Sequence, residues 1–314
     1  MSLLKKVEET RSGLKVLAFG ESGSGKSTFG LSFPEIAGVD SEDGWKWFKG
    51  TDVAKNLKLE APTTSIEDLE DILNEVEEDL IGEVKTVLID SETKFYENQQ
   101  HSGLNIAEKR ARKKGQSSED ANISQREWGK IKLIGKRVQS RKITLASLGI
   151  NIVSIAQEKP IKEKKGENWV TVGYEPDTGK GLQYDYDVVL RLLKPKAKDG
   201  IFKAEILKDR TGVFKVGDII ENPSYELWRD VVEGKSDKKI HKLDFKEDIK
   251  KDEKAMESEV EQLGNLIEEF KSLLKKADQK TKIKVVAKAK ELGIENPLTC
   301  TDIEKIKELI KVIK

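Results

Sequence analysis

Residues 15–28 read KVLAFGESGSGKST, an apolar run that leads directly into the pattern Gly-x-x-x-x-Gly-Lys-Ser of a phosphate-binding loop (Walker A motif). The motif requires a buried strand before it and a helix after it, and the residues on both sides fit that context. Glycines at positions 20, 23 and 25 let the backbone turn its N–H groups toward one anion without a Cβ clash. A Gly/Ser-rich turn that matches by chance is the alternative, and the flanking pattern disfavours it.

The motif assigns chemistry to its own residues. We expect Lys26 to reach the β- and γ-phosphates of ATP, Ser27 to bind Mg²⁺, and the following helix to point its positive end at the phosphates. The residues expected to contact the nucleotide are Gly20, Glu21, Ser22, Gly23, Ser24, Gly25, Lys26, Ser27 and Thr28.

Apolar runs alternate with helical patterns over residues 14–234, which predicts an α/β core with a mostly parallel central sheet. Expected strands are Lys15–Phe19, Ile36–Asp40, Thr86–Asp90, Ile150–Ala156, Val188–Leu193 and Phe202–Lys208; expected helices are Ile66–Leu80 and Trp128–Leu148. Two long polar stretches, residues 97–124 and 159–180, are predicted to be irregular. The remaining segments are a polar lead-in (1–13), a charged linker (235–255) and a small C-terminal domain of two or three helices (256–314).

Charge is balanced overall, with 57 Lys and Arg against 57 Asp and Glu, but it is unevenly placed. Residues 60–92 contain 12 acidic and 1 basic residue, whereas residues 108–142 contain 12 basic and 4 acidic residues. This asymmetry suggests a local face for a polyanion, and a solvated helix surface is the alternative.

The chain has one cysteine and two histidines, which excludes an internal disulfide framework and disfavours zinc chemistry. Its N-terminus is too polar for a signal peptide, and no apolar stretch approaches the roughly 18 residues of a membrane span. We therefore expect a cytoplasmic protein without a membrane partner.

Polar residues follow several of the expected strands. Asp90 ends an apolar strand and is the expected second Mg²⁺ ligand, while Glu42 follows another strand and could position the attacking water. Gln157 could sense the γ-phosphate or merely cap its strand. Lys208 and Arg210 suit phosphate contacts, with a surface salt bridge as the ordinary alternative.

The order of these segments resembles the RecA-like recombinase ATPases from about Lys15 to Phe214. FGESGSGKST, GVDSED, TVLIDS, IVSIAQ and LKDRTGVF are similar to successive motifs of that family. The resemblance implies a RecA-like core in which Glu42 activates water, Asp90 is the Walker B acid and Gln157 senses nucleotide. It also implies that Lys208 and Arg210 reach the γ-phosphate of a neighbouring subunit, hence a homo-oligomer, either a ring or a filament.

Within that family, the chain looks most like the compact phage single-strand annealing recombinases, the ATPase branch of the Sak group. This implies an ATPase that binds single-stranded DNA and supports homologous recombination or strand annealing. Two alternatives stay open: a RecA-like motor that remodels DNA or protein without recombinase activity, and a nucleotide-gated module that binds a repressor or a single-strand binding protein.

Two predicted loops supply the expected DNA contacts, because in the family the corresponding loops face the DNA. Cations neutralise phosphates and an aromatic ring can stack on an unpaired base. The candidates are Lys109, Arg110, Arg112, Lys113, Lys114, Lys162, Lys164, Lys165 and Trp169. Ordinary solvated loops remain the alternative. The eight lysines within residues 271–290 could form a DNA face of the C-terminal domain or only its solubilising surface.

Overall fold

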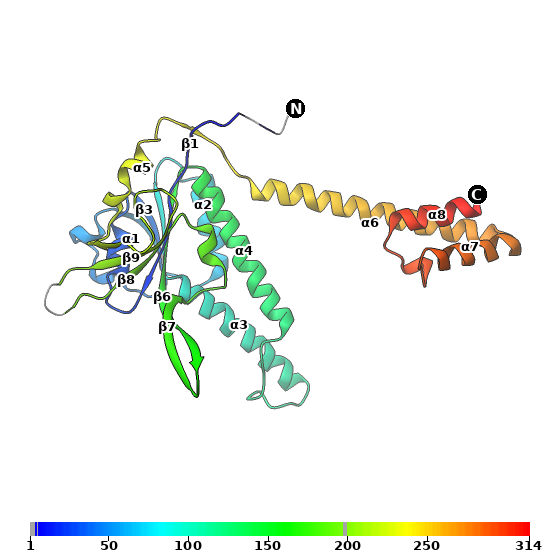
Figure 1. The fold of residues 1–314 in the computed structure, drawn as a ribbon, viewed down its shortest axis with the longest axis horizontal. Helices are drawn as coiled ribbons and strands as arrows, with labels where there is room; N and C mark the ends of the chain where they lie inside the picture. The colour runs from blue at the N-terminus through cyan, green and yellow to red at the C-terminus, as the bar shows by residue number, and fades with distance from the viewer. Residues whose placement is uncertain (1–3, 5, 197–199) are drawn as a thin grey trace. The chain divides into compact units, whose positions relative to one another are not determined.

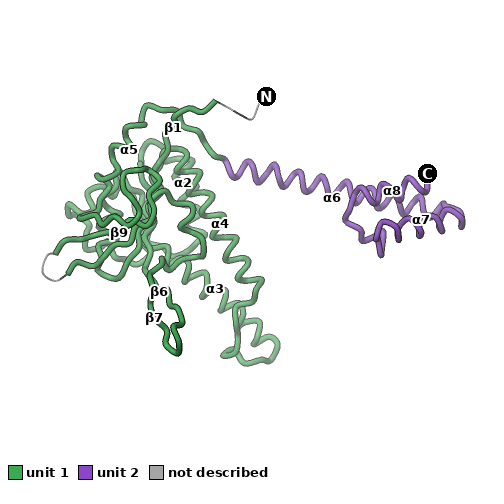
Figure 2. Tube along the Cα trace, viewed as in Figure 1, with its two compact units in different colours: residues 1–243 green, residues 244–314 purple. Residues whose placement is uncertain are grey.

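The computed structural model describes residues 4, 6–196 and 200–314. The chain divides into two compact units, residues Met1–Leu243 and Asp244–Lys314, which are described separately (Figure 2). Of the predicted lead-in, residues 1–3 and 5 lie outside the described part.

A nine-stranded sheet forms the centre of the first unit, in the order β10-β9-β8-β2-β6-β5-β3-β4 with β7 paired to β6 (Figure 1). Strands β8, β2, β6, β5, β3 and β4 run parallel, while β7, β9 and β10 are antiparallel to their neighbours. The predicted α/β fold with a mostly parallel sheet is confirmed. The strands are β2 (Lys15–Gly20), β3 (Ile36–Asp40), β4 (Leu57–Ala61), β5 (Thr86–Asp90), β6 (Asn151–Lys165), β7 (Asn168–Pro176), β8 (Val188–Leu193), β9 (Lys203–Asp209) and β10 (Ile219–Glu221).

Helices cover both faces of this sheet and give three layers. Along β2 the side chains alternate: Val16 and Ala18 join the core under α1 and α5, whereas Leu17 and Phe19 join the core under α2 and α4. This alternation is what a strand buried on both faces requires. The helices are α1 (Lys26–Leu31), α2 (Ile66–Glu78), α3 (Glu92–Lys113), α4 (Gln125–Ser147) and α5 (Arg229–Glu233), with short 3₁₀ turns at Trp45–Trp47, Asp52–Ala54, Leu182–Asp185 and Tyr225–Leu227.

The strand register places several of the predicted site residues at one edge of the sheet. Gly20 pairs with Gln157, and Asp40 pairs with Asp90. Because these strands are parallel, their carboxyl ends and the loops that follow them meet at that edge.

Both stretches predicted to be irregular are largely regular, so those predictions are wrong. Helix α3 continues through residues 97–113, and Ser124 begins α4 with a capping box to Glu127. Residues 159–176 form the β6–β7 hairpin, in which backbone pairing replaces the expected loop.

The predicted charged linker, residues 235–255, contains a short strand and the start of a helix. Lys239–Ile240 (β11) pairs in parallel with Thr10–Arg11 (β1), and the next helix already begins at Phe245. Charged residues at high density are compatible with a solvated helix, which composition alone does not distinguish from a linker.

The second unit consists of α6 (Phe245–Lys276), α7 (Gln279–Glu291), a 3₁₀ turn (Pro297–Thr299) and α8 (Ile303–Ile313), so the predicted C-terminal helices are confirmed. Asp244, Asp278 and Asp302 cap the three helices by accepting backbone N–H bonds. Its core is built from Phe270, Val285, Ala289, Ile294, Ile306, Leu309 and Ile310. Within the described residues of both units, none of the helices has the length and apolarity to span a bilayer.

Candidate functional site

The loop between β2 and α1 has the backbone that a phosphate cradle needs. Gly23 and Gly25 have φ angles of +78° and +85°, a region that side chains rarely adopt. A Cβ on Gly20 would lie 2.3 Å from the carbonyl oxygen of Leu192, and one on Gly25 would lie 2.7 Å from the ring of Phe202. Glycine is therefore required at these positions for steric reasons.

Lys26 is held at this loop by oxygen atoms alone. Its Nζ donates to the carbonyl oxygens of Gly20 at 3.0 Å and Glu21 at 2.7 Å. Burial lowers the pKa of Lys26, and the carboxylates of Asp90 and Glu42 oppose that shift. The amine thus lies between the loop and the acidic residues, where an incoming phosphate would find a cation.

Ser27 and Asp90, the two predicted Mg²⁺ ligands, are in contact. Ser27 Oγ donates to Asp90 Oδ2 at 2.6 Å, and the buried indole of Trp45 donates to the same oxygen at 3.0 Å. Burial raises the pKa of the Asp90 carboxyl, and the two hydrogen bonds counteract it.

These two oxygen ligands fit Mg²⁺, which prefers oxygen and takes its remaining ligands from water and substrate phosphates. Among the described residues there is no cluster of three or more His, Cys, Asp or Glu side chains that could hold a metal ion.

Asp40 shapes the segment that carries Glu42. Its carboxylate accepts the backbone N–H groups of Glu42, Gly44 and Trp45 at 3.1, 3.2 and 2.8 Å. This turn fixes the exit from β3, so the position of Glu42 relative to the sheet edge is determined by the backbone rather than by its own side chain.

The Glu42 carboxylate contacts two partners: Ser91, the residue after β5, and Gln157 on β6. Its Oε1 accepts from Ser91 Oγ at 2.8 Å and from Gln157 Nε2 at 3.0 Å. Glu42 and Gln157, predicted separately from the sequence, are therefore brought together. Ser91 was not predicted; a serine after Asp90 gives no signal in a single sequence.

A chain of contacts continues from Gln157 to the β6–β7 hairpin. The next residue, Glu158, forms a two-pronged ion pair with Arg191 at 2.7 and 3.2 Å. The Arg191 guanidinium lies 3.8 Å from the centre of the Tyr174 ring on β7. Nothing in the sequence pattern pointed to these three residues.

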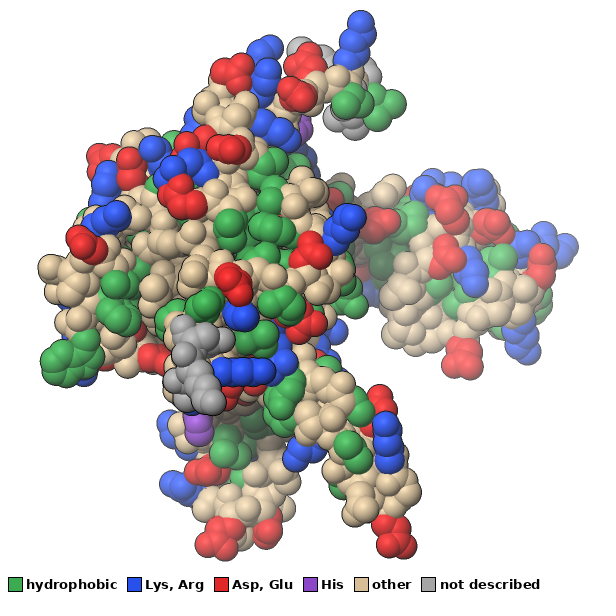
Figure 3. Space-filling view, turned by 60° about the vertical axis from the view of Figure 1, so that its left-hand side comes forward, with side chains coloured by type: hydrophobic (Ala, Val, Ile, Leu, Met, Phe, Trp, Pro, Cys, Tyr) green, Lys and Arg blue, Asp and Glu red, His purple; other side chains and the backbone are tan. Residues whose placement is uncertain are grey.

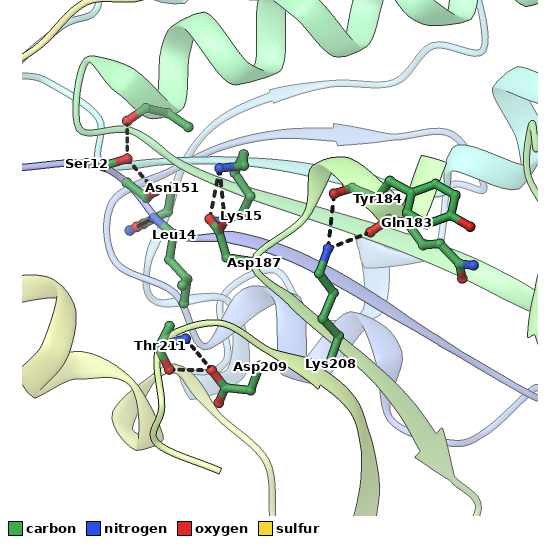
Figure 4. A network of polar contacts seen from close by, with 12 residues as sticks. Ser12, Leu14, Lys15, Asn151, Gln183, Tyr184, Asp187, Lys208, Asp209 and Thr211 are labelled. Carbon is green, nitrogen blue, oxygen red and sulfur yellow. Dashed lines mark hydrogen bonds and ion pairs between the residues drawn. The ribbon is translucent and has the colours of Figure 1, made fainter. Parts of the chain in front are cut away.

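Lys208 and Arg210 do not join this site. Asp209 pairs with Val188 at the start of β8, whereas the loop end of β2 pairs with Leu192, so the two cations lie toward the opposite end of the sheet. Lys208 donates to the carbonyl oxygens of Gln183 and Tyr184 (Figure 4). Burial and the nearby Arg210 lower the pKa of Lys208.

The predicted DNA-contacting residues occupy two elements that extend beyond the same edge of the sheet (Figure 1). On α3, Arg110 is ion-paired with Glu127 and Arg112 with Glu108, while Lys109, Lys113 and Lys114 are exposed. On the hairpin, Lys164 lies opposite Trp169 and Lys162 opposite Thr171, so these side chains share one face. Trp169 is 67% exposed.

Residues 12–214, nearly two thirds of the chain, match the family described as AAA domain. The chain belongs to this AAA domain family. Membership in this family implies nucleotide binding, so the prediction of a P-loop ATPase is confirmed at the level of the family. No curated protein matches the sequence.

Among solved structures, the AAA domain protein is similar to one titled "Crystal structure of the RadB recombinase". The TM-score is 0.41 and the identity 16%, over 68% of this chain and 87% of that chain.

Proposed function

We propose that this protein is a Mg²⁺-dependent ATPase that binds single-stranded DNA and supports phage-type recombination or strand annealing. Support comes above all from the hydrogen bond between Glu42 and Gln157, because it links the candidate water-positioning carboxylate to the strand that continues into the β6–β7 hairpin. Residues 12–214 would be the ATPase core, and residues 244–314 an appended helical domain.

In the proposed reaction, Lys26 and the loop N–H groups bind the phosphates, while Ser27 and Asp90 hold the Mg²⁺ that neutralises phosphate charge. Glu42 orients the attacking water and accepts its proton at the carboxylate. Gln157 can bond either to Glu42, as seen here, or to a γ-phosphate. A change of partner would alter the position of Glu158, Arg191 and the hairpin.

The DNA part of the proposal rests on surface chemistry. Lys162 and Lys164 share a face of the hairpin with Trp169, which combines phosphate-neutralising cations with a stacking platform. Elsewhere on the visible surface, lysines and arginines are interspersed with acidic residues (Figure 3). The proposed DNA contact therefore depends on this face of the hairpin and not on the net charge of the protein.

Replacing Lys26 with alanine tests the nucleotide site. Lys26→Ala should weaken ATP binding by about tenfold or more and abolish turnover, because it removes the cation at the loop. Titration of a fluorescent ATP analogue and a phosphate-release assay measure the two effects. Lys55→Ala, which replaces an exposed lysine that directly follows the Asp52–Ala54 turn, is the matched control. Normal ATPase activity in Lys26→Ala would falsify the assignment.

DNA dependence of turnover separates the candidate activities. Stimulation by single-stranded but not duplex DNA supports the recombinase proposal. Directional unwinding would instead indicate a motor, and tight ATP binding with negligible turnover a nucleotide-gated binding module.

A further inference from the structure

The C-terminal unit contains a groove with an apolar floor and a basic rim, here called the lysine groove. It has a volume of about 660 Å³, and its floor is formed by Phe270, Leu274, Val285, Val286, Ile294 and Leu298. Val286 and Leu298 are 57% and 46% exposed, so the floor is open to a partner.

Four lysines surround this floor: Lys271, Lys275, Lys282 and Lys290, against one acidic lining residue, Glu295. Lys271 is paired with Glu268. Within the described residues, Lys275, Lys282 and Lys290 form no ion pair, although Lys282 lies near enough to Asp278 to help lower the pKa of its carboxyl, so the rim still presents net positive charge to an occupant.

The same unit carries a surface of opposite character, here called the acidic stripe. Ile249, Met256 and Val260 on α6 are exposed by 58%, 67% and 71%. Their spacing of seven and four residues places them on one side of the helix, over about 17 Å. Four carboxylates flank them, those of Asp252, Glu253, Glu257 and Glu261.

We propose that the acidic stripe of one copy of this protein docks in the lysine groove of a second copy. The two surfaces match in both respects, since apolar side chains meet an apolar floor while carboxylates meet unpaired lysines. The stripe cannot reach the groove of its own chain, because residues 249–261 and the groove residues Phe270 and Leu274 belong to one continuous helix.

The other long acidic helix of the described residues, α2, does not fit the groove. The acidic helix α2 has its apolar residues Leu69, Leu73 and Val76 buried in the core of the first unit, so it has no apolar face to offer. Docking of stripe into groove uses two different surfaces of each copy, which makes the contact head-to-tail. Such a contact repeats into a ring if the rotation closes and into a filament if it does not.

Charge reversal tests this interface in the full-length protein. The groove variant is Lys275→Glu with Lys282→Glu, and the stripe variant is Glu257→Lys with Glu261→Lys. Each alone should weaken self-association by about tenfold or more, because two attractive contacts become repulsive. Sedimentation without nucleotide or DNA measures association independently of ATPase activity, and helical circular dichroism verifies folding.

Restoring self-association by combining the two variants is a stricter test of the interface than losing it in either one. An equimolar mixture of the two variants should associate again, since the lysine stripe of one meets the glutamate groove of the other, and a chain that carries both reversals should also self-associate. Lys280→Glu with Lys284→Glu, a change of equal charge on α7 outside the groove lining, should have no effect.

Three outcomes overturn the proposal: a wild-type protein that stays monomeric up to about 100 μM, a groove variant that associates normally, or a mixture that remains dissociated. Loss of single-stranded DNA affinity in the groove variant with unchanged sedimentation would assign the groove to DNA. Binding of an acidic peptide from another protein to a monomeric chain would assign it to that partner.

Discussion

At the residue scale, the hydrogen bonds around Glu42 make a quantitative prediction. Glu42→Gln should retain ATP binding and slow hydrolysis by about 100-fold, because the amide cannot accept a proton from the attacking water. Single-turnover hydrolysis with saturating enzyme measures the chemical step. Asp43→Asn removes a neighbouring carboxylate whose partner is Lys46, and should leave the rate unchanged.

A Glu42→Gln variant with wild-type single-turnover kinetics would assign the water-positioning role to another residue. Ser91, just after β5, and Gln157, on β6, both donate hydrogen bonds to the Glu42 carboxylate. The glutamine replacement preserves an oxygen for these donors, so a loss of rate is not simply a loss of position.

A second prediction concerns the buried ion pair behind the site. Lys142 contacts the Glu92 carboxylate, which also accepts from Ser154 Oγ at 2.6 Å, and both charged side chains are nearly inaccessible. Lys142→Met should lower the free energy of unfolding by about 3–5 kcal/mol, because it leaves Glu92 charged and uncompensated in the core. Urea unfolding followed by circular dichroism measures the loss.

Removing both charges separates this effect from packing. The double variant Lys142→Met with Glu92→Gln should recover a large part of the lost stability, since no unpaired charge remains. If the double variant is as unstable as the single one, Lys142 contributes through its shape rather than through its charge.

The sequence predicted those site residues that stand at the end of an apolar run. Asp90 ends an apolar run, and Gln157 ends another, so their places at the sheet edge follow from strand length and direction. Trp45, Ser91 and Arg191 were not predicted, because their roles depend on which side chains meet across separate strands. That information resides in the register of the sheet, which local patterns do not specify.

At the scale of elements, α3 shows why a long helix was missed. Its face toward α4 is lined by small residues, Gly103, Ala107 and Ala111, spaced four apart. A search for large apolar residues at helical spacing does not detect such a face. The hairpin was missed for a different reason: Val170, Val172 and Tyr174 alternate as in a strand, but they lie in a segment rich in Gly, Pro and Lys, a composition typical of loops.

The hairpin carries the element-scale prediction. Trp169→Ala should weaken single-stranded DNA binding by about 1–3 kcal/mol, because one base loses its stacking platform. Fluorescence anisotropy with a labelled oligonucleotide measures the affinity. Trp47→Ala is the matched control, since Trp47 is 80% exposed but lies on the turn after β3.

Equal losses in Trp169→Ala and Trp47→Ala would contradict a specific role for the hairpin. An unchanged affinity in both would leave the exposed lysines of α3 as the candidate contact. The slope of the logarithm of affinity against the logarithm of salt concentration then tests whether these lysines contact phosphates. Each phosphate contact contributes about 0.7 to the magnitude of that slope for a single strand.

At the scale of the whole molecule, Arg210 lies far from the phosphate loop of its own chain, so it could act only on the loop of a neighbouring copy. Mixing two inactive variants tests this role. Lys26→Ala and Arg210→Ala should each abolish DNA-stimulated turnover, because one lacks the loop cation and the other the cation offered to a neighbour. An equimolar mixture should regain about a quarter of wild-type activity, the fraction of random head-to-tail interfaces with both groups intact. Phosphate release reports the result.

Arg210 suits this test because its exposed side chain makes no hydrogen bond or ion pair within the described residues, so its removal should not disturb folding. A mixture of Lys26→Ala with the double variant Lys26→Ala, Arg210→Ala is the control and should stay inactive. Failure of the first mixture to regain activity would show that Arg210 does not act across an interface.

The strand order also has a consequence for how the chain is made. Strand β2 lies between β6 and β8, whose pairing residues are more than 130 positions later in the sequence. At ribosomal rates of about 5–20 residues per second, the segment that later binds nucleotide waits on the order of ten seconds for its neighbours. During that time it is an unpaired apolar strand, so the nascent chain depends on protection from aggregation until residues near 190 have emerged.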